Sequence, residues 1–225
     1  MGATDGLMGS LVALPLLVTS LTSMILIFER LWFWNRIARR QRSLISGVLD
    51  SYSQNPQTAL LKLKKNADLP ASRIFLAALT LPEATPEEFR IALESAAQGE
   101  LPLLQRFSTA LNTIVGIAPL LGLLGTILGL MQSLAALELG QGGSENTLQV
   151  TAGIDEALIS TAVGLAIAIS TLVFANVFQG LYRRQRAFLQ EAGGQLELLY
   201  RRQYRHFFKE HRAQPQSNRP KPSSS

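Results

Sequence analysis

The sequence contains no cysteine, which excludes disulfide bridges and thiolate metal sites. It is also poor in charge: charged residues make up 16% of the chain and apolar residues 47%, whereas roughly a quarter of a typical soluble domain is charged. Three long stretches, 6–28, 107–137 and 157–182, lack charged residues altogether. A bilayer core about 30 Å thick needs about 20 apolar helical residues, so each stretch is long enough to span a membrane. The alternative, a soluble protein with three buried helices, would have too little polar sequence to cover them.

Lysine and arginine are absent from the amino end and from residues 138–156, whose charged residues are all acidic. Arginines follow the first apolar stretch at positions 30, 36, 39, 40 and 42, and the third at 183, 184 and 186. The positive-inside rule therefore predicts an external amino end and a cytoplasmic carboxyl end. The acidic start and the length of the first stretch favour a retained anchor over a cleaved signal peptide. Contact with anionic lipid headgroups explains the net charge of +5 without nucleic acid.

These patterns predict an all-α polytopic membrane protein with three transmembrane helices and long helices that extend into the cytoplasm. The expected order is an external N-terminus (1–6), a transmembrane helix (7–28), a cytoplasmic helical domain (29–107), a transmembrane helix (108–137), an external loop (138–156), a transmembrane helix (157–182), a cytoplasmic helical extension (183–212) and a disordered tail (213–225).

Prolines and a capping pattern predict helix boundaries inside the cytoplasmic domain. Asn55-Pro56, Leu69-Pro70 and Leu81-Pro82 are expected to interrupt helices. Thr85-Pro86-Glu87-Glu88 predicts a helix start, with a Thr cap, Pro in the first position and Glu three residues after the cap. This helix is expected to continue into the second span, with a bend near Gly99 and Pro102.

Small residues form a stripe on the second and third spans. In lipid, helices associate through close approach of small residues, so a second helix or a pore should face this stripe. Pro119, inside the second span, removes one backbone hydrogen bond and predicts a kink. The small residues expected to pack helices are Gly122, Gly125 and Gly129 in the second span and Ala157, Gly164 and Ala168 in the third.

Three polar residues accompany the stripe. Thr126 and Thr161 lie on the small faces, where each one alone is more typical of a packing residue bonded to its own backbone than of a transport residue. Glu156 stands at the outer end of the third span, about 90° around the helix from the centre of the stripe. It is either a partner of the helix dipole or a residue at a pore entrance or subunit contact.

No ionisable residue lies inside any span, so a proton carrier in the membrane would have to come from another chain. The sequence also lacks a nucleotide-binding loop and any spacing of His, Asp and Glu typical of a metal site. We therefore expect no enzyme activity, catalytic residue, metal or cofactor.

Two segments carry a family resemblance: GELPLLQRFSTALNTIVGIAPLLGLLGTILGLM and, after a short loop, AGIDEALISTAVGLAIAISTLVFANVF. Their PLLGLLGT-x-x-G and GI-x-EAL-x-x-TA-x-GL-x-x-AI motifs resemble the ExbB/TolQ/MotA proton-channel family. Within this family, the sequence PLLGLLGT is closer to ExbB than to TolQ. Three spans match ExbB or TolQ, whereas MotA-type stators have four. One departure is Ser170, where the family often has proline, which puts a kink of the third helix in doubt.

The resemblance implies a subunit of a proton-motive-force-driven motor in a bacterial inner membrane. Such subunits form a homo-oligomer, a pentamer in the family, around a dimer of a single-span partner (ExbD or TolR) whose membrane aspartate carries the proton. Proton flow is coupled to a periplasm-spanning protein such as TonB or TolA. Thr126 and Thr161 match the family's pore-lining threonines, Glu156 its glutamate at the head of the third helix, and Asn176 an asparagine near the inner end.

The leading hypothesis is an ExbB-like subunit that energises TonB-dependent transport across an outer membrane. A TolQ-like subunit for envelope integrity is the alternative within the family. A structural membrane scaffold without proton conduction is the alternative outside it, with the small faces only packing helices.

Overall fold

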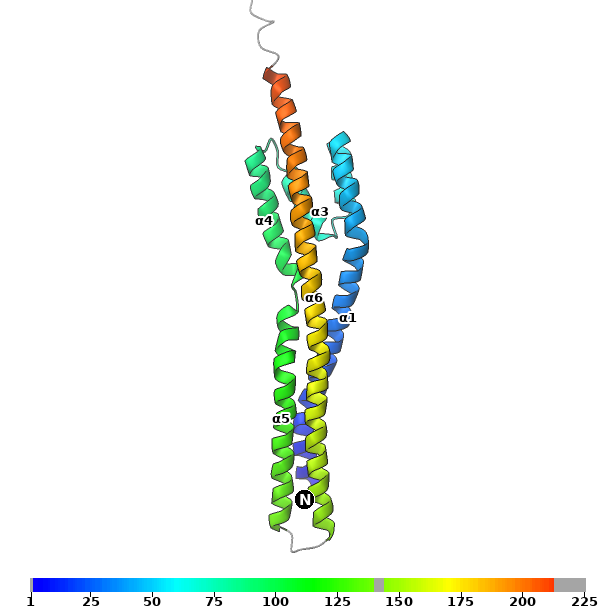
Figure 1. Cartoon of the computed structure of the whole chain (residues 1–225), viewed down its shortest axis with the longest axis vertical. Coiled ribbons are helices and arrows are strands. Elements are labelled where there is room, and N and C mark those ends of the chain that lie inside the picture. The colour runs from blue at the N-terminus through cyan, green and yellow to red at the C-terminus, as the bar shows by residue number, and fades with distance from the viewer. Residues whose placement is uncertain (1, 140–143, 213–225) are drawn as a thin grey trace, which may run out of the picture. The chain divides into compact units, whose positions relative to one another are not determined.

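The computed structural model describes the backbone of residues 2–139 and 144–212, and the side chains of residues 12–135 and 150–206. The described elements are all α-helices (Figure 1). In chain order they are α1 (Gly2–Gln54), α2 (Pro56–Lys65), α3 (Pro70–Leu79), α4 (Pro86–Leu104), α5 (Ser108–Leu139) and α6 (Ser144–Arg212). The chain divides into a membrane unit, residues 1–34 and 105–182, and a helical unit, residues 35–104 and 183–225.

The membrane unit packs the first part of α1 against α5 and the first half of α6 (Figure 1). One buried cluster joins the three helices through Val12 and Leu16, Ile114 and Ala118, and Ile167 and Ala168. A second cluster contains Trp34, Leu111, Ala175 and Phe178. Each cluster therefore contains residues of α1, α5 and α6.

Large apolar side chains cover the outside of the membrane unit. Leu14, Ile25, Leu120, Leu158 and Ile169 are each at least 55% exposed, which would be unfavourable for a surface in water. Within the described residues, three helices are long and apolar enough to cross a membrane. The chain is therefore an all-α, multi-pass membrane protein, as the sequence predicts.

The helical unit is built from short helices that begin where prolines and caps predict. The Asn55 side chain accepts a hydrogen bond from the Gln57 amide (2.9 Å), and α2 then starts at Pro56. Helix α3 starts at Pro70. The predicted capping box of α4 is confirmed, because the Glu88 amide donates to Thr85 Oγ1 (3.3 Å) and the Thr85 amide donates to Glu88 Oε2 (2.7 Å).

Two ion-pair clusters join these helices. Arg36 and Arg40 of α1 both bind Asp68 Oδ2, at 2.9 and 2.8 Å. The guanidinium of Arg73 in α3 donates to both carboxylate oxygens of Glu100 in α4, each at 2.6 Å.

In the part of α6 that follows the third span, Leu189 and Leu196 are buried. The segment after the third span is thus one continuous helix with a packed apolar face.

The structure differs from the sequence-based expectations at two connections. Instead of bending into the second span, α4 ends at Leu104 and α5 begins at Ser108; Phe107 between them has a φ of 67°, a left-handed conformation that interrupts the helix. Helix α6 begins at Ser144, so much of the predicted external loop is helical; the acidic Glu145 near its start favours this. The predicted disordered tail, 213–225, lies outside the described residues, as do the side chains of the predicted external N-terminus.

Candidate functional site

At the α5–α6 contact in the membrane unit, the backbones of the two helices lie directly against each other. A Cβ atom added to Gly164 would lie 2.6 Å from the Ala118 carbonyl oxygen, and one added to Gly122 would lie 2.9 Å from Thr161 Cα. Both opposing atoms belong to the backbone and have little freedom to yield. Glycine is therefore required at these two positions for the helices to touch.

Two hydroxyl groups of α6 converge on one carbonyl of α5. Thr161 Oγ1 donates to the Gly122 oxygen at 2.9 Å, and Ser160 Oγ lies 3.2 Å from the same oxygen. Ser160 also donates to Ala157 in its own helix, at 2.7 Å. The predicted site residue Thr161 thus makes an interhelical contact within the chain.

The remaining small residues lie at the same contact. A Cβ atom on Gly129 would lie 2.8 Å from the Ala157 Cβ, and one on Gly125 would lie 2.3 Å from Ser160 Oγ. Ala168 is buried in the cluster that contains Ala118. The stripe on α6 therefore faces a second helix, α5, one of the two occupants that the sequence allows.

The other predicted site residues do not join this hydrogen-bonded group. Thr126 is half-buried, and its hydroxyl donates to the Leu123 carbonyl of its own helix at 2.7 Å. Asn176 is exposed on α6. Helix α5 runs through Pro119 as a single element. The structure therefore brings Thr161 and the glycines together, whereas the Thr126 hydroxyl bonds within its own helix and Asn176 is exposed.

Glu156 lines a cleft of about 240 Å³ in the membrane unit. Its walls are mostly apolar and come from α1, α5 and α6; Gly125, Gly129, Gln132 and Ser160 contribute to them. Neither Thr126 nor Thr161 lines this cleft. Glu156 thus shares a surface with part of the small-residue stripe but not with the two threonines.

Two buried polar features escaped the sequence analysis. Ser23 of α1 and Thr171 of α6 form a buried hydroxyl–hydroxyl bond of 2.6 Å. The signal for Thr171 was present, because it continues the three- and four-residue spacing of Thr161, Gly164 and Ala168. Arg30 is buried beside the Phe33 ring, 5.3 Å from its centroid, although its position next to the span suggested only a flanking charge.

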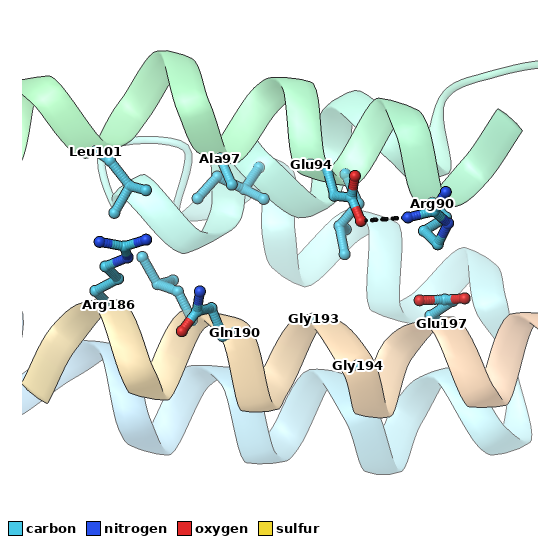
Figure 2. A pocket seen from close by; sticks show the side chains of 12 residues that line it. Arg90, Glu94, Ala97, Leu101, Arg186, Gln190, Gly193, Gly194 and Glu197 are labelled. Atoms are coloured by element: carbon cyan, nitrogen blue, oxygen red, sulfur yellow. Dashed lines mark hydrogen bonds and ion pairs between the residues drawn. The ribbon is translucent and has the colours of Figure 1, made fainter. Parts of the chain in front are cut away.

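A second cavity, of about 340 Å³, lies between α4 and α6 in the helical unit (Figure 2). Leu93 reaches towards Gly193, where an added Cβ atom would come within 2.9 Å of it. On the rim, Arg90 pairs with Glu94 at 2.6 Å, and Glu197 pairs with Arg201 at 2.8 Å. Leucine and alanine side chains line the cavity together with charged residues from these pairs and with Arg186, so α4 and α6 pack here through both apolar and charged residues.

The chemistry of the membrane unit follows from its side chains. The spans supply hydroxyl groups and carbonyls, which can relay hydrogen bonds, but their interiors supply no group that gains or loses a charge. In the described part of the chain, no group of three His, Cys, Asp or Glu side chains could hold a metal ion.

Fold and site together define a class: multi-pass helical membrane proteins whose tightly packed spans carry hydroxyl groups but no ionisable carrier. Residues 66–191 match the family model described as the MotA/TolQ/ExbB proton channel family. The chain belongs to that family, and the resemblance predicted from its motifs is confirmed.

Relatives of known name cover the chain to different extents. A Synechocystis sp. protein named ExbB-like 3 is 58% identical over 194 residues, which are 86% of this chain and 92% of the relative. The biopolymer transport protein ExbB of Salmonella typhimurium is 36% identical over 114 residues, 51% of this chain and 45% of the relative. The Tol-Pal system protein TolQ of Haemophilus influenzae is 38% identical over 96 residues, 42% and 41% of the two chains. The sequence identity of this chain to the Salmonella ExbB is therefore similar to its identity to the Haemophilus TolQ.

Proposed function

We propose that the chain is a non-enzymatic, ExbB-like subunit of a proton-motive-force-driven motor that energises TonB-dependent transport across an outer membrane. In this proposal it lies in the bacterial inner membrane with a periplasmic N-terminus and a cytoplasmic C-terminus. Copies of the chain form a ring, a pentamer by family resemblance, around an ExbD- or TolR-like single-span partner. The energy released by proton flow is transmitted to a TonB- or TolA-like protein.

The observation that carries this proposal is the chemistry of the spans. They hold hydroxyl groups at Thr126 and Thr161 but have no ionisable residue in their interiors. In this proposal the proton carrier comes from another chain, the single-span partner. The arginines that follow the first and third spans support the orientation.

The double substitution Thr126→Val and Thr161→Val tests whether these two hydroxyl groups take part in the proton pathway. Both changes keep the side-chain shape and remove only the hydroxyl groups, so we expect coupled uptake of iron complexes or cobalamin to fall to the background of a null strain. The complex should still assemble, because an interhelical hydrogen bond in a membrane contributes only about 0.6 kcal/mol. Uptake in cells and co-purification of the partner in mild detergent are the measurements.

Two variants separate a pathway role from packing. Thr22→Val removes an exposed hydroxyl that bonds to its own helix at Val18, as Thr126 bonds to Leu123. Ser160→Ala removes the other hydroxyl near the Gly122 carbonyl. Both controls should retain uptake. Full uptake in the double valine variant would refute the assigned role of the threonines.

A TolQ-like role is the second candidate, favoured by the comparable identity to TolQ. A null strain discriminates the two: loss of iron-complex or cobalamin uptake supports the ExbB-like role, and sensitivity to detergent supports the TolQ-like one. The Thr161–Gly122 hydrogen bond supports the scaffold alternative, because this bond can hold the helices together without a proton pathway. Purification of a homo-oligomer that never carries a single-span partner would favour the scaffold.

A further inference from the structure

The largest of the three cavities described here is a groove of about 640 Å³ in the helical unit. It is lined by residues from the end of α1, from α2, from the end of α3, from the α3–α4 connection and from α6. The lining residues are Tyr52, Pro56, Gln57, Leu60, Leu79, Glu83, Ala84, Tyr200, Gln203 and Tyr204. Three tyrosines and a proline thus meet on one open surface.

The aromatic walls of this groove are held in place. Tyr200 stacks on Phe89 with ring centroids 4.1 Å apart and donates a hydrogen bond to the Ala84 carbonyl at 2.6 Å. Tyr52 is 5% exposed. Its burial, and to a lesser degree the nearby Tyr200, raises the pKa of Tyr52 to about 12. The groove is therefore preformed, which lowers the entropic cost of binding.

Rigid, aromatic-lined grooves are the surfaces that recognise proline-rich segments in the polyproline II conformation. Such a segment loses little entropy on binding, because proline already restricts it to that conformation. One charged residue, Glu83, lies among the lining residues. The charge of the groove therefore favours a proline-rich segment that also carries a positive charge.

The chain contains one segment with this chemistry, next to the groove in sequence. The tail AQPQSNRPKPSSS, residues 213–225, carries three prolines, and its Arg219-Pro220-Lys221-Pro222 run alternates cations with prolines. Helix α6 ends at Arg212, only about 12 Å beyond Tyr204 at 1.5 Å per residue. The eight residues from Ala213 to Pro220 would span about 25 Å in the polyproline II conformation at 3.1 Å per residue. The tail is therefore long enough to return to the groove of its own chain.

We propose that residues 213–225 dock in this groove of the same chain, with Pro220 and Pro222 against the tyrosines and a neighbouring cation beside Glu83. Because the tail is tethered, its effective concentration at the groove is on the order of millimolar. A segment that would dissociate as a free peptide therefore stays bound. The proposal is independent of the transport role.

The absence of cysteine makes disulfide trapping a direct test. The full-length protein with Gln57→Cys and Ser223→Cys is oxidised in native membranes, and the disulfide within one chain is quantified by mass spectrometry. Its control carries Thr58→Cys and Ser223→Cys, because Thr58 is exposed, adjacent in α2 and not part of the groove lining. Docking should make the Gln57→Cys pair form at least about tenfold faster, since it concentrates the tail at one wall.

Two further variants identify the chemistry and the occupant. Pro220→Ala with Pro222→Ala should slow trapping at Gln57→Cys to the rate of the Thr58→Cys control, while the fold is untouched. Equal rates for the two cysteine pairs, or fast trapping without the prolines, would overturn the proposal. Co-expression of a Gln57→Cys chain with a Ser223→Cys chain should give few disulfide-linked dimers; fast dimer formation would assign the groove to the tail of a neighbouring copy and also overturn it.

Discussion

At the scale of single residues, Gly164 determines how closely α5 and α6 approach. The three atoms nearest to a Cβ added there are the Ala118 oxygen at 2.6 Å, the Gly122 Cα at 3.1 Å and the Gly122 nitrogen at 3.2 Å. All three belong to the backbone of α5, so no side chain can rotate away. Thr161, one turn earlier on α6, reaches the Gly122 carbonyl only at this helix separation.

We expect Gly164→Ala to push the two helices apart and to destabilise the membrane unit by about 1–3 kcal/mol, the usual cost of overpacking. The shift should also lengthen the Thr161–Gly122 hydrogen bond. Unfolding of the purified protein by increasing SDS in mild detergent measures the loss.

Gly180→Ala is the matched control, because it lies on the same helix and a Cβ atom there would meet nothing within 4 Å. It should leave stability unchanged or raise it by up to about 1 kcal/mol. Equal stability of the two variants would show that the helices are not in contact at Gly164.

At the scale of elements, the start of α4 depends on a carboxylate. Glu88 accepts hydrogen bonds from the Thr85 amide at 2.7 Å and the Thr85 hydroxyl at 2.8 Å. The bond from the amide, and next the bond from the hydroxyl, lower the pKa of Glu88 below its ordinary 4.5. A lowered folded-state pKa means that the ionised form stabilises the folded helix. This contribution is complete above pH 4.5 and is lost as the pH falls through the lowered pKa.

Glu88→Gln should therefore lower the melting temperature of the protein at neutral pH, and the difference from wild type should shrink as the pH falls below 4.5. Circular dichroism in detergent at a series of pH values measures this difference. Glu191→Gln removes an exposed carboxylate from α6 and serves as the control. A difference that stays constant across this pH range would contradict the role of the ionised capping box.

The elements differ in how far the sequence alone predicts them. The three spans, the helix starts at Pro56 and Pro70 and the Thr85 cap are local patterns, so a single sequence contains them. The break at Phe107 was missed because its left-handed conformation has no glycine to signal it. Convergence of two hydroxyls on Gly122 was also missed, since it depends on the register between α5 and α6, which the pattern of either helix alone does not determine.

At the scale of the whole molecule, the three spans carry hydroxyl groups but no ionisable residue in their interiors. The membrane unit contains hydroxyl groups that pair with each other or with carbonyls, as Ser23 does with Thr171 and Thr161 with Gly122. Ionisable side chains inside membrane proteins mark proton relays, and the interiors of these spans contain none. Glu156, the carboxylate closest in sequence to the interior of the third span, precedes that span at its amino-terminal end.

The chain reconstituted alone in liposomes should therefore not dissipate an imposed pH gradient faster than empty liposomes. A pH-sensitive dye inside the vesicles measures the gradient, and an uncoupler added at the end shows that the vesicles were sealed. Co-reconstitution with a single-span partner that carries a membrane aspartate should speed the dissipation, and Thr126→Val with Thr161→Val should reverse this gain. Proton flux through the chain alone that Glu156→Gln abolishes would instead make Glu156 the carrier, and the spans would then form a complete pathway without a partner.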